Sequence, residues 1–263
     1  MTTTKSYNLR LHLKSCINKI FRKTYQFCRA KYKWNTTRKE SLKAINTTLK
    51  DEGDLIYEGF EIIEEIAQKL SGISYSSSFS RVCGLVLIKG RNLCQGLFGL
   101  ALEGLAQESG ALLRPTIECF ELLEYFYQDP KRIEKALKGK LPSAGKIAQK
   151  IKGKFKDLRN HLNVHASHLS IAPESMVHLI NWNEGSFKIK QVYSESVLKT
   201  NLSTLFCFLF FLCTSAAKCL DECNLLSDTI IHRINKWRQK GLQIVKPTLV
   251  SKESIRNETF HDS

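Results

Sequence analysis

One short motif in the sequence contains side chains suited to acid–base and phosphate chemistry. Arg159 and Asn160 are adjacent, and His165 follows six residues after the arginine. A histidine can move a proton near neutral pH, and an arginine can neutralise charge that builds up on a phosphate. A small polar residue beside the arginine can position the backbone. Together these side chains are suited to chemistry at a phosphate group, with the histidine moving the proton and the arginine facing the charge.

A second pair of such side chains, Arg114 and Glu118, lies four residues apart in a helical pattern. Residues at this spacing share one face of a helix. Their neighbours are apolar, and an unpaired buried charge is very costly. We therefore expect both side chains to be buried and bonded to each other or to residues 159–165. The pair could specify the fold, or it could form a polar pocket inside a helical bundle.

The histidines also allow interpretations other than catalysis. A similar combination, Arg256-Asn257 with His261 five residues after the arginine, lies in a polar stretch and is interpreted as a chance match. His161, His165 and His168 could line one helix face and bind zinc, but Leu162 stands where zinc-binding helices carry a glutamate. A polar helix face explains these histidines better, so we expect no metal and no cofactor.

In most of the chain the apolar residues recur at the spacing of an α-helix. Residues 176–193 instead alternate apolar and polar side chains around Asn183-Glu184-Gly185, which predicts a β-hairpin. The expected fold is mostly α: a helical bundle with a small β-hairpin insertion and a basic N-terminal amphipathic helix. The predicted helices cover residues 8–33, 54–70, 81–107, 110–127, 129–139, 145–168 and 197–223, and a further helix ends near residue 240.

The net charge of +15 is unevenly distributed. Residues 1–50 contain 13 Lys/Arg and one acid, so +12, and residues 131–163 contain 11 and 2, so +9. Residues 51–130, between these basic blocks, contain 5 Lys/Arg and 13 acids, so −8. Such blocks indicate a polyanion partner, either nucleic acid or an anionic membrane surface, although a solubilising tail and a solvated helix face explain them too. An Arg-rich start is also typical of organelle transit peptides.

The nine cysteines indicate a reducing compartment. Nine is an odd number, and most of the cysteines lie in apolar helical runs, as expected of reduced thiols in a cytoplasmic protein rather than of a disulfide framework.

The apolar run at residues 202–217 is 16 residues long, short of the roughly 20 that span a bilayer. We predict that it is the core helix of a bundle. The alternative is a membrane anchor.

Several motifs follow one another in a characteristic order in the middle of the chain. A helix contains Leu112-Leu113-Arg114 and then Glu118, and Asp129-Pro130 starts a short segment. A helix ending in His165-Ala166-Ser167, a hairpin and an apolar helix follow. The order of these motifs resembles that in the HEPN superfamily, and in particular in HEPN-like bacterial proteins that include relatives of abortive-infection factors. The resemblance covers about residues 80–223.

This resemblance implies both a function and an assembly. HEPN proteins cleave or bind RNA, typically as homodimers whose motif residues meet across the interface. The expectation is a protein that acts on RNA, as a metal-independent endoribonuclease of a toxin or phage-defence system, with an antitoxin as a further partner. The resemblance assigns site roles to Arg114, Glu118, Arg159, Asn160 and His165.

The expected organisation has three parts. Residues 1–50 form a basic helical arm, residues 51–240 the HEPN-like domain, and residues 241–263 a polar tail. Removing the arm is predicted to leave the helical core folded. The alternative function is a non-enzymatic helical adaptor that binds nucleic acid or an anionic membrane through the arm, and a third is an integral membrane protein anchored by residues 202–217.

Overall fold

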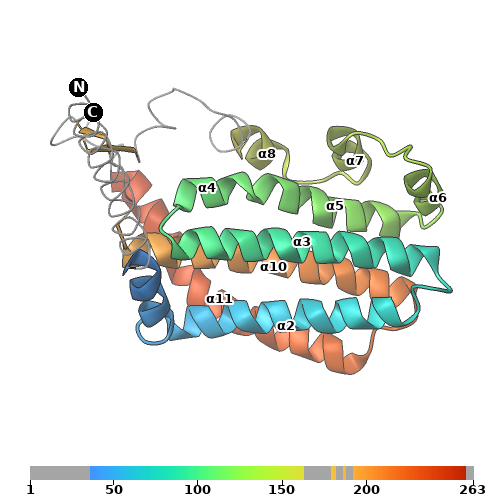
Figure 1. Cartoon of the computed structure of the whole chain (residues 1–263), viewed down its shortest axis with the longest axis horizontal. Coiled ribbons are helices and arrows are strands. Elements are labelled where there is room, and N and C mark those ends of the chain that lie inside the picture. The colour runs from blue at the N-terminus through green and yellow to red at the C-terminus, as the bar shows by residue number, and fades with distance from the viewer. Residues whose placement is uncertain (1–35, 163–178, 182–185, 188–191, 259–263) are drawn as a thin grey trace, which may run out of the picture.

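The computed structural model describes residues 36–162, 179–181, 186–187 and 192–258, the last thirteen of these as helix backbone alone. Within this part of the chain, long helices form a bundle around α10, which packs against each of the others (Figure 1). The mostly helical fold agrees with the prediction. The long helices are α2 (Lys50–Gly72), α3 (Ser78–Leu102), α5 (Leu113–Gln128), α10 (Glu195–Glu222) and α11 (Asp228–Glu258).

The apolar run at residues 202–217 forms the centre of α10. Leu205, Leu209, Leu212 and Ala216 are fully buried, at the spacing of three or four residues that keeps side chains on one side of a helix. This confirms the prediction of a core helix. By length and composition alone, both α10 and α3 are also apolar enough to cross a membrane.

Helix α11 is held against α2 by an aromatic side chain. Trp237 is fully buried, and its Nε1 donates a hydrogen bond to the carbonyl oxygen of Leu55 at 2.8 Å. The predicted helix end near residue 240 is wrong, because α11 continues to Glu258. Val245 is 4% exposed, so its apolar side chain keeps the helix on the core beyond residue 240. The predicted polar tail therefore does not begin at residue 241.

The predicted helix over residues 81–107 is divided in two. Helix α3 ends at Leu102, and α4 (Ala106–Ala111) follows. Between them Gly104 has φ +76°, a left-handed conformation that stops an α-helix and that glycine adopts readily. The N–H of Leu105 donates back to the carbonyl of Leu100, which completes the helix end.

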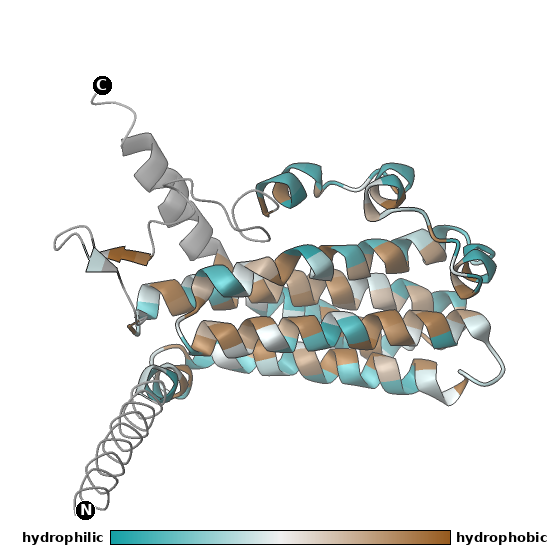
Figure 2. Ribbon diagram, turned by 45° about the horizontal axis from the view of Figure 1, so that its top comes forward, coloured by the Kyte–Doolittle hydropathy of each residue, from teal (hydrophilic) through white to brown (hydrophobic). Residues whose placement is uncertain are grey.

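The basic block after α5 is also divided. The predicted continuous helix from residue 145 is broken between α7 (Ala144–Lys150) and α8 (Lys156–Leu162), where Lys152 has φ 54°. Figure 1 shows the short helices along the outer side of α5, and Figure 2 shows them as mostly hydrophilic. Their polar surface faces outward from the bundle. These helices are α6 (Arg132–Leu137), α7 (Ala144–Lys150) and α8 (Lys156–Leu162).

Two predicted elements fall mainly outside the described residues. Strands β1 (Ile180–Asn181) and β2 (Ser186–Phe187) pair antiparallel, with Ile180 opposite Phe187. The rest of the predicted hairpin, apart from residues 179, 192 and 193, lies outside the description. The predicted amphipathic helix at residues 8–33 does so entirely.

The boundary drawn at residue 50 differs from the structure. Residues 36–45 are helical, and Ile45 and Leu49 are each 2% exposed. The Oγ1 of Thr48 also donates to Glu195 Oε2 at 2.8 Å, which joins this segment to the start of α10. The core therefore begins before residue 50.

Candidate functional site

A cavity of about 310 Å³ lies between α5 and the α7–α8 segment. We call it the α5–α8 pocket. It brings together four of the residues predicted from sequence: Arg114, Glu118, Arg159 and Asn160. The first and last of these are 46 positions apart in the chain. Among the described residues it is lined by Arg114, Glu118, Ala144, Gly145, Ala148, Gln149, Lys152, Gly153, Lys156, Arg159 and Asn160.

Apolar anchors hold the α7–α8 segment over α5. Ile147 and Ala148 of α7 are buried. Between the two short helices, the Phe155 ring packs edge-on against Phe120 of α5 at 5.1 Å and against Phe211 of α10 at 5.0 Å between centroids. Because these contacts flank the linker, its backbone is fixed where it forms one wall of the pocket.

Arg114 and Glu118 form the ion pair that their spacing predicts. Arg114 Nε lies 3.3 Å from Glu118 Oε1. The prediction that both are buried is wrong, since their side chains are 34% and 35% exposed. They line the open pocket because the α7–α8 segment leaves a space above them.

The most buried ion pair of the site involves a residue that sequence reasoning missed. Arg159 Nη1 lies 2.5 Å from Glu121 Oε2, and their side chains are only 12% and 3% exposed. Glu121 follows Glu118 by three residues, so Arg114, Glu118 and Glu121 share one face of α5. That spacing, with buried Phe120 and Leu123 on either side, was the signal available in the sequence.

The second oxygen of the buried carboxylate is in an unusual position. Glu121 Oε1 has no hydrogen-bond partner among the described residues. It faces Gly153, where an added Cβ would lie 2.7 Å from Oε1. Burial raises the pKa of Glu121, Arg159 opposes that rise, and Glu118 adds to it. The charged carboxylate therefore depends on Arg159 for its stability.

The remaining motif residues have different surroundings. Asn160 and His161 are exposed on α8, and Asn160 lines the pocket. His165 lies outside the described residues, as does His168, so the predicted approach of Arg159 to His165 stays a prediction.

The balance of charge in the pocket is positive. Counting the described side chains, Arg114, Arg159, Lys152 and Lys156 provide four positive charges, against Glu118 and the buried Glu121. The surrounding residues 131–163 add to this field, since they contain 11 Lys/Arg and two acids. A concave site of this kind attracts phosphate groups.

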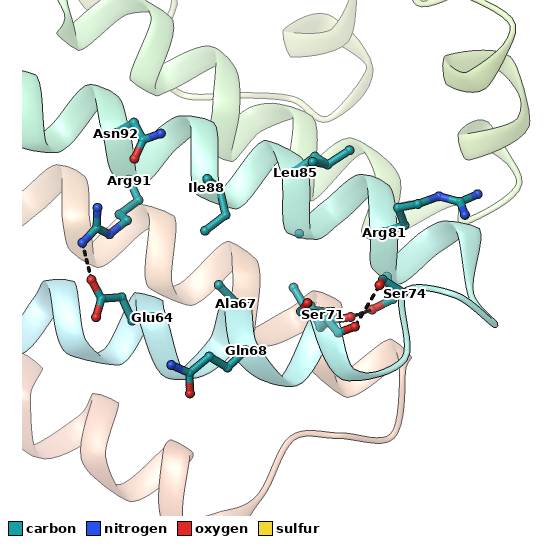
Figure 3. Close-up of a pocket in the computed structure, with 13 residues that line it drawn as sticks. Glu64, Ala67, Gln68, Ser71, Ser74, Arg81, Leu85, Ile88, Arg91 and Asn92 are labelled. Atoms are coloured by element: carbon teal, nitrogen blue, oxygen red, sulfur yellow. Dashed lines mark hydrogen bonds and ion pairs between the residues drawn. The ribbon is translucent and has the colours of Figure 1, made fainter.

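A second cavity, of about 510 Å³, lies between α2 and α3 near the turn that joins them (Figure 3). Its apolar wall includes Leu85 and Ile88, which are 67% and 41% exposed. Figure 3 shows Arg91 turned toward Glu64, with which it forms an ion pair that neutralises both charges. Because it gathers less unneutralised charge, we do not assign this cavity the phosphate chemistry.

Comparison of the chain with protein-family models, with curated proteins and with solved structures finds no significant match. The function proposed below therefore depends on the residues and geometry of the α5–α8 pocket and on the motif resemblance.

Proposed function

We propose that this protein binds RNA, with one phosphate group seated in the α5–α8 pocket. The observation that carries the proposal is the meeting of Arg159 and Asn160 with Lys152 and Lys156 in a cavity of about 310 Å³. Arginine offers a planar fork of donors that fits phosphate oxygens, and lysine offers a mobile point charge. The basic surface of α6 to α8 extends the contact along the RNA backbone.

The motif resemblance supports a further step, RNA cleavage. In this hypothesis His165 takes the 2′-hydroxyl proton, Arg159 stabilises charge on the phosphate, and Asn160 orients the pair. Residues six apart lie about 240° around a regular helix. The two therefore meet only if the long Arg159 side chain reaches around the helix, if the helix ends near His165, or if they come from different subunits. The predicted homodimer would satisfy the last condition.

The binding proposal is tested with a labelled single-stranded RNA. The double variant Lys152→Gln/Lys156→Gln should bind about tenfold more weakly, and the slope of log affinity against log salt should become shallower by about 1–2. The matched control is Lys236→Gln/Arg238→Gln, which removes two exposed charges from α11. Equal affinities of the two double variants would contradict RNA binding in the pocket.

The cleavage hypothesis is tested in EDTA. His165→Ala should lower the cleavage rate by about 10²–10⁴-fold and leave RNA binding nearly unchanged, because a general base contributes to rate rather than to affinity. His261→Ala, in the chance match, should behave as wild type. An RNA with 2′-deoxyribose at the cleaved position should bind and stay intact. Cleavage that persists in His165→Ala would contradict the assignment.

A second candidate function is favoured by the charge of residues 1–50, which is +12. Such an arm could bind an anionic membrane surface rather than RNA. Vesicles containing phosphatidylserine distinguish the two. Membrane binding should be lost on deletion of residues 1–35 and be unaffected by Lys152→Gln/Lys156→Gln, whereas RNA binding in the pocket should depend on the lysines.

Two further partners follow from the resemblance and stay predictions: a second copy of the chain and an antitoxin. Light scattering coupled to size-exclusion chromatography measures the first directly, and a mass near 60 kDa, twice 30.1 kDa, is expected.

A further inference from the structure

We infer that Glu121 is the positioning residue of the α5–α8 pocket, holding Arg159 so that its guanidinium meets the phosphate of a bound RNA. This inference rests on the proposed function. A carboxylate would then be needed for binding a polyanion, whereas its negative charge alone would be expected to repel the phosphate.

Arg159 and Glu121 are joined by a direct charged hydrogen bond. Arg159 Nη1 donates to Glu121 Oε2 at 2.5 Å, and the two side chains are 12% and 3% exposed. A guanidinium has five N–H donors, and this bond uses one. Since Arg159 also lines the pocket, its other donors can reach a ligand there. Glu121 therefore fixes one side of a fork whose other side is available to phosphate.

The segment between α7 and α8 supports the Glu121 carboxylate from behind. Its Oε1 lies against Gly153, where an added Cβ would be 2.7 Å from that oxygen and 3.4 Å from the carbonyl of Ala148. The linker between α7 and α8 thus packs directly on the carboxylate. Gly153 allows this approach, so the pocket wall and the Glu121–Arg159 pair are fixed together.

Glu118 and Glu121 lie on the same face of α5 but differ in burial. Glu118 lies one turn before Glu121 and also bonds an arginine, at 3.3 Å. Its side chain is 35% exposed, so solvent screens the pair and weakens its hold on the arginine. Two carboxylates on one helix face therefore have different roles: Glu118 contributes negative charge at the pocket rim, whereas Glu121 orders a ligand-binding group.

Replacing each carboxylate by glutamine tests this difference, because the inference predicts opposite changes in RNA affinity from those that charge alone predicts for Glu121. Glu118→Gln and Glu121→Gln each remove one negative charge near the phosphate, and simple electrostatics predicts tighter RNA binding for both. We expect Glu118→Gln to bind equally well or more tightly. We expect Glu121→Gln to bind about tenfold more weakly, because the charged hydrogen bond that orders Arg159 is lost. Tighter binding by Glu121→Gln would overturn the inference.

A second pair of variants keeps every charge and guards against misfolding of Glu121→Gln. Gly153→Ala should displace the Glu121 carboxylate and weaken RNA binding, since its new Cβ meets Oε1. Gly145→Ala, also in the pocket wall, meets nothing within 4 Å and should bind as wild type. Equal, wild-type affinity for both alanine variants would overturn the inference.

A double-mutant cycle shows whether Glu121 acts through Arg159. Arg159→Lys keeps a cation beside Glu121 and loses the fork. If Glu121 positions Arg159, Glu121→Gln/Arg159→Lys binds RNA no more weakly than Arg159→Lys alone. Additive losses would assign Glu121 a general structural role and overturn the inference.

The failure of this inference is distinguishable from failure of the proposed function. Weaker RNA binding by Lys152→Gln/Lys156→Gln together with wild-type affinity of Glu121→Gln would leave the pocket as the RNA site and remove only the role of Glu121. Wild-type affinity of the lysine double variant would overturn both.

Discussion

Arg159 and Glu118 are both ion-paired residues of the pocket, yet their removal should affect stability very differently. Arg159→Ala leaves the carboxylate of Glu121, which is 3% exposed, without a partner, and should lower the free energy of unfolding by about 3–5 kcal/mol. Glu118→Ala breaks a pair that is about one-third exposed on each side and should cost less than about 1 kcal/mol. Urea unfolding of the two variants measures the difference, and equal losses would contradict this account.

The raised pKa of Glu121 predicts how stability depends on pH. The folded state holds the Glu121 proton more tightly than the unfolded chain, in which the pKa has its ordinary value near 4.5. Wild-type stability relative to Glu121→Gln should therefore fall as pH rises from about 4.5 through the raised pKa, and should recover on acidification. Unfolding free energies of both proteins across this window check the sign. Gly145→Ala should keep the wild-type dependence.

At the scale of the helices, the packing of α3 predicts opposite effects of one substitution at two positions. An added Cβ at Gly90 would lie 2.9 Å from Leu212 Cδ1 and 3.2 Å from Cys119 Cβ, whereas at Gly99 it meets nothing within 4 Å. Gly90→Ala should destabilise, since overpacking costs about 1–3 kcal/mol against roughly 1 kcal/mol gained in helix propensity. Gly99→Ala should raise the free energy of unfolding by up to about 1 kcal/mol. Thermal unfolding of both variants tests the close contact of α3 with α10 and α5.

For the whole molecule, two truncations separate the basic N-terminal charge from the core. Residues 1–35 contain nine Lys/Arg and no acid, so deleting them should weaken salt-dependent binding of polyanions. Deleting residues 1–50 also removes Ile45 and Leu49, each 2% exposed, and each such loss costs about 2–5 kcal/mol. The shorter deletion should therefore stay folded and the longer one lose most of its stability, as circular dichroism with urea unfolding would show. This replaces the expectation from sequence that residues 1–50 are dispensable for folding.

Features that depend on residues close together in the chain could be predicted from the sequence. The period of apolar residues in α10 predicted a buried helix, and the helix carries fully buried Leu205, Leu209 and Leu212. The four-residue spacing of Arg114 and Glu118 predicted their ion pair, which is present. Such predictions succeed because neighbours within one or two helical turns define the helix face on which a side chain lies.

The positions of the helix breaks and the burial of charged residues could be seen only in the tertiary structure. The left-handed conformations of Gly104 and Lys152 divide two helices that the apolar pattern predicted as continuous. Glu121 is buried and Glu118 is not, although both lie on the same face of α5, because the α7–α8 linker covers only one of them. The burial of an ionisable side chain depends on which distant segment packs over it, and helical periodicity contains no information about that segment.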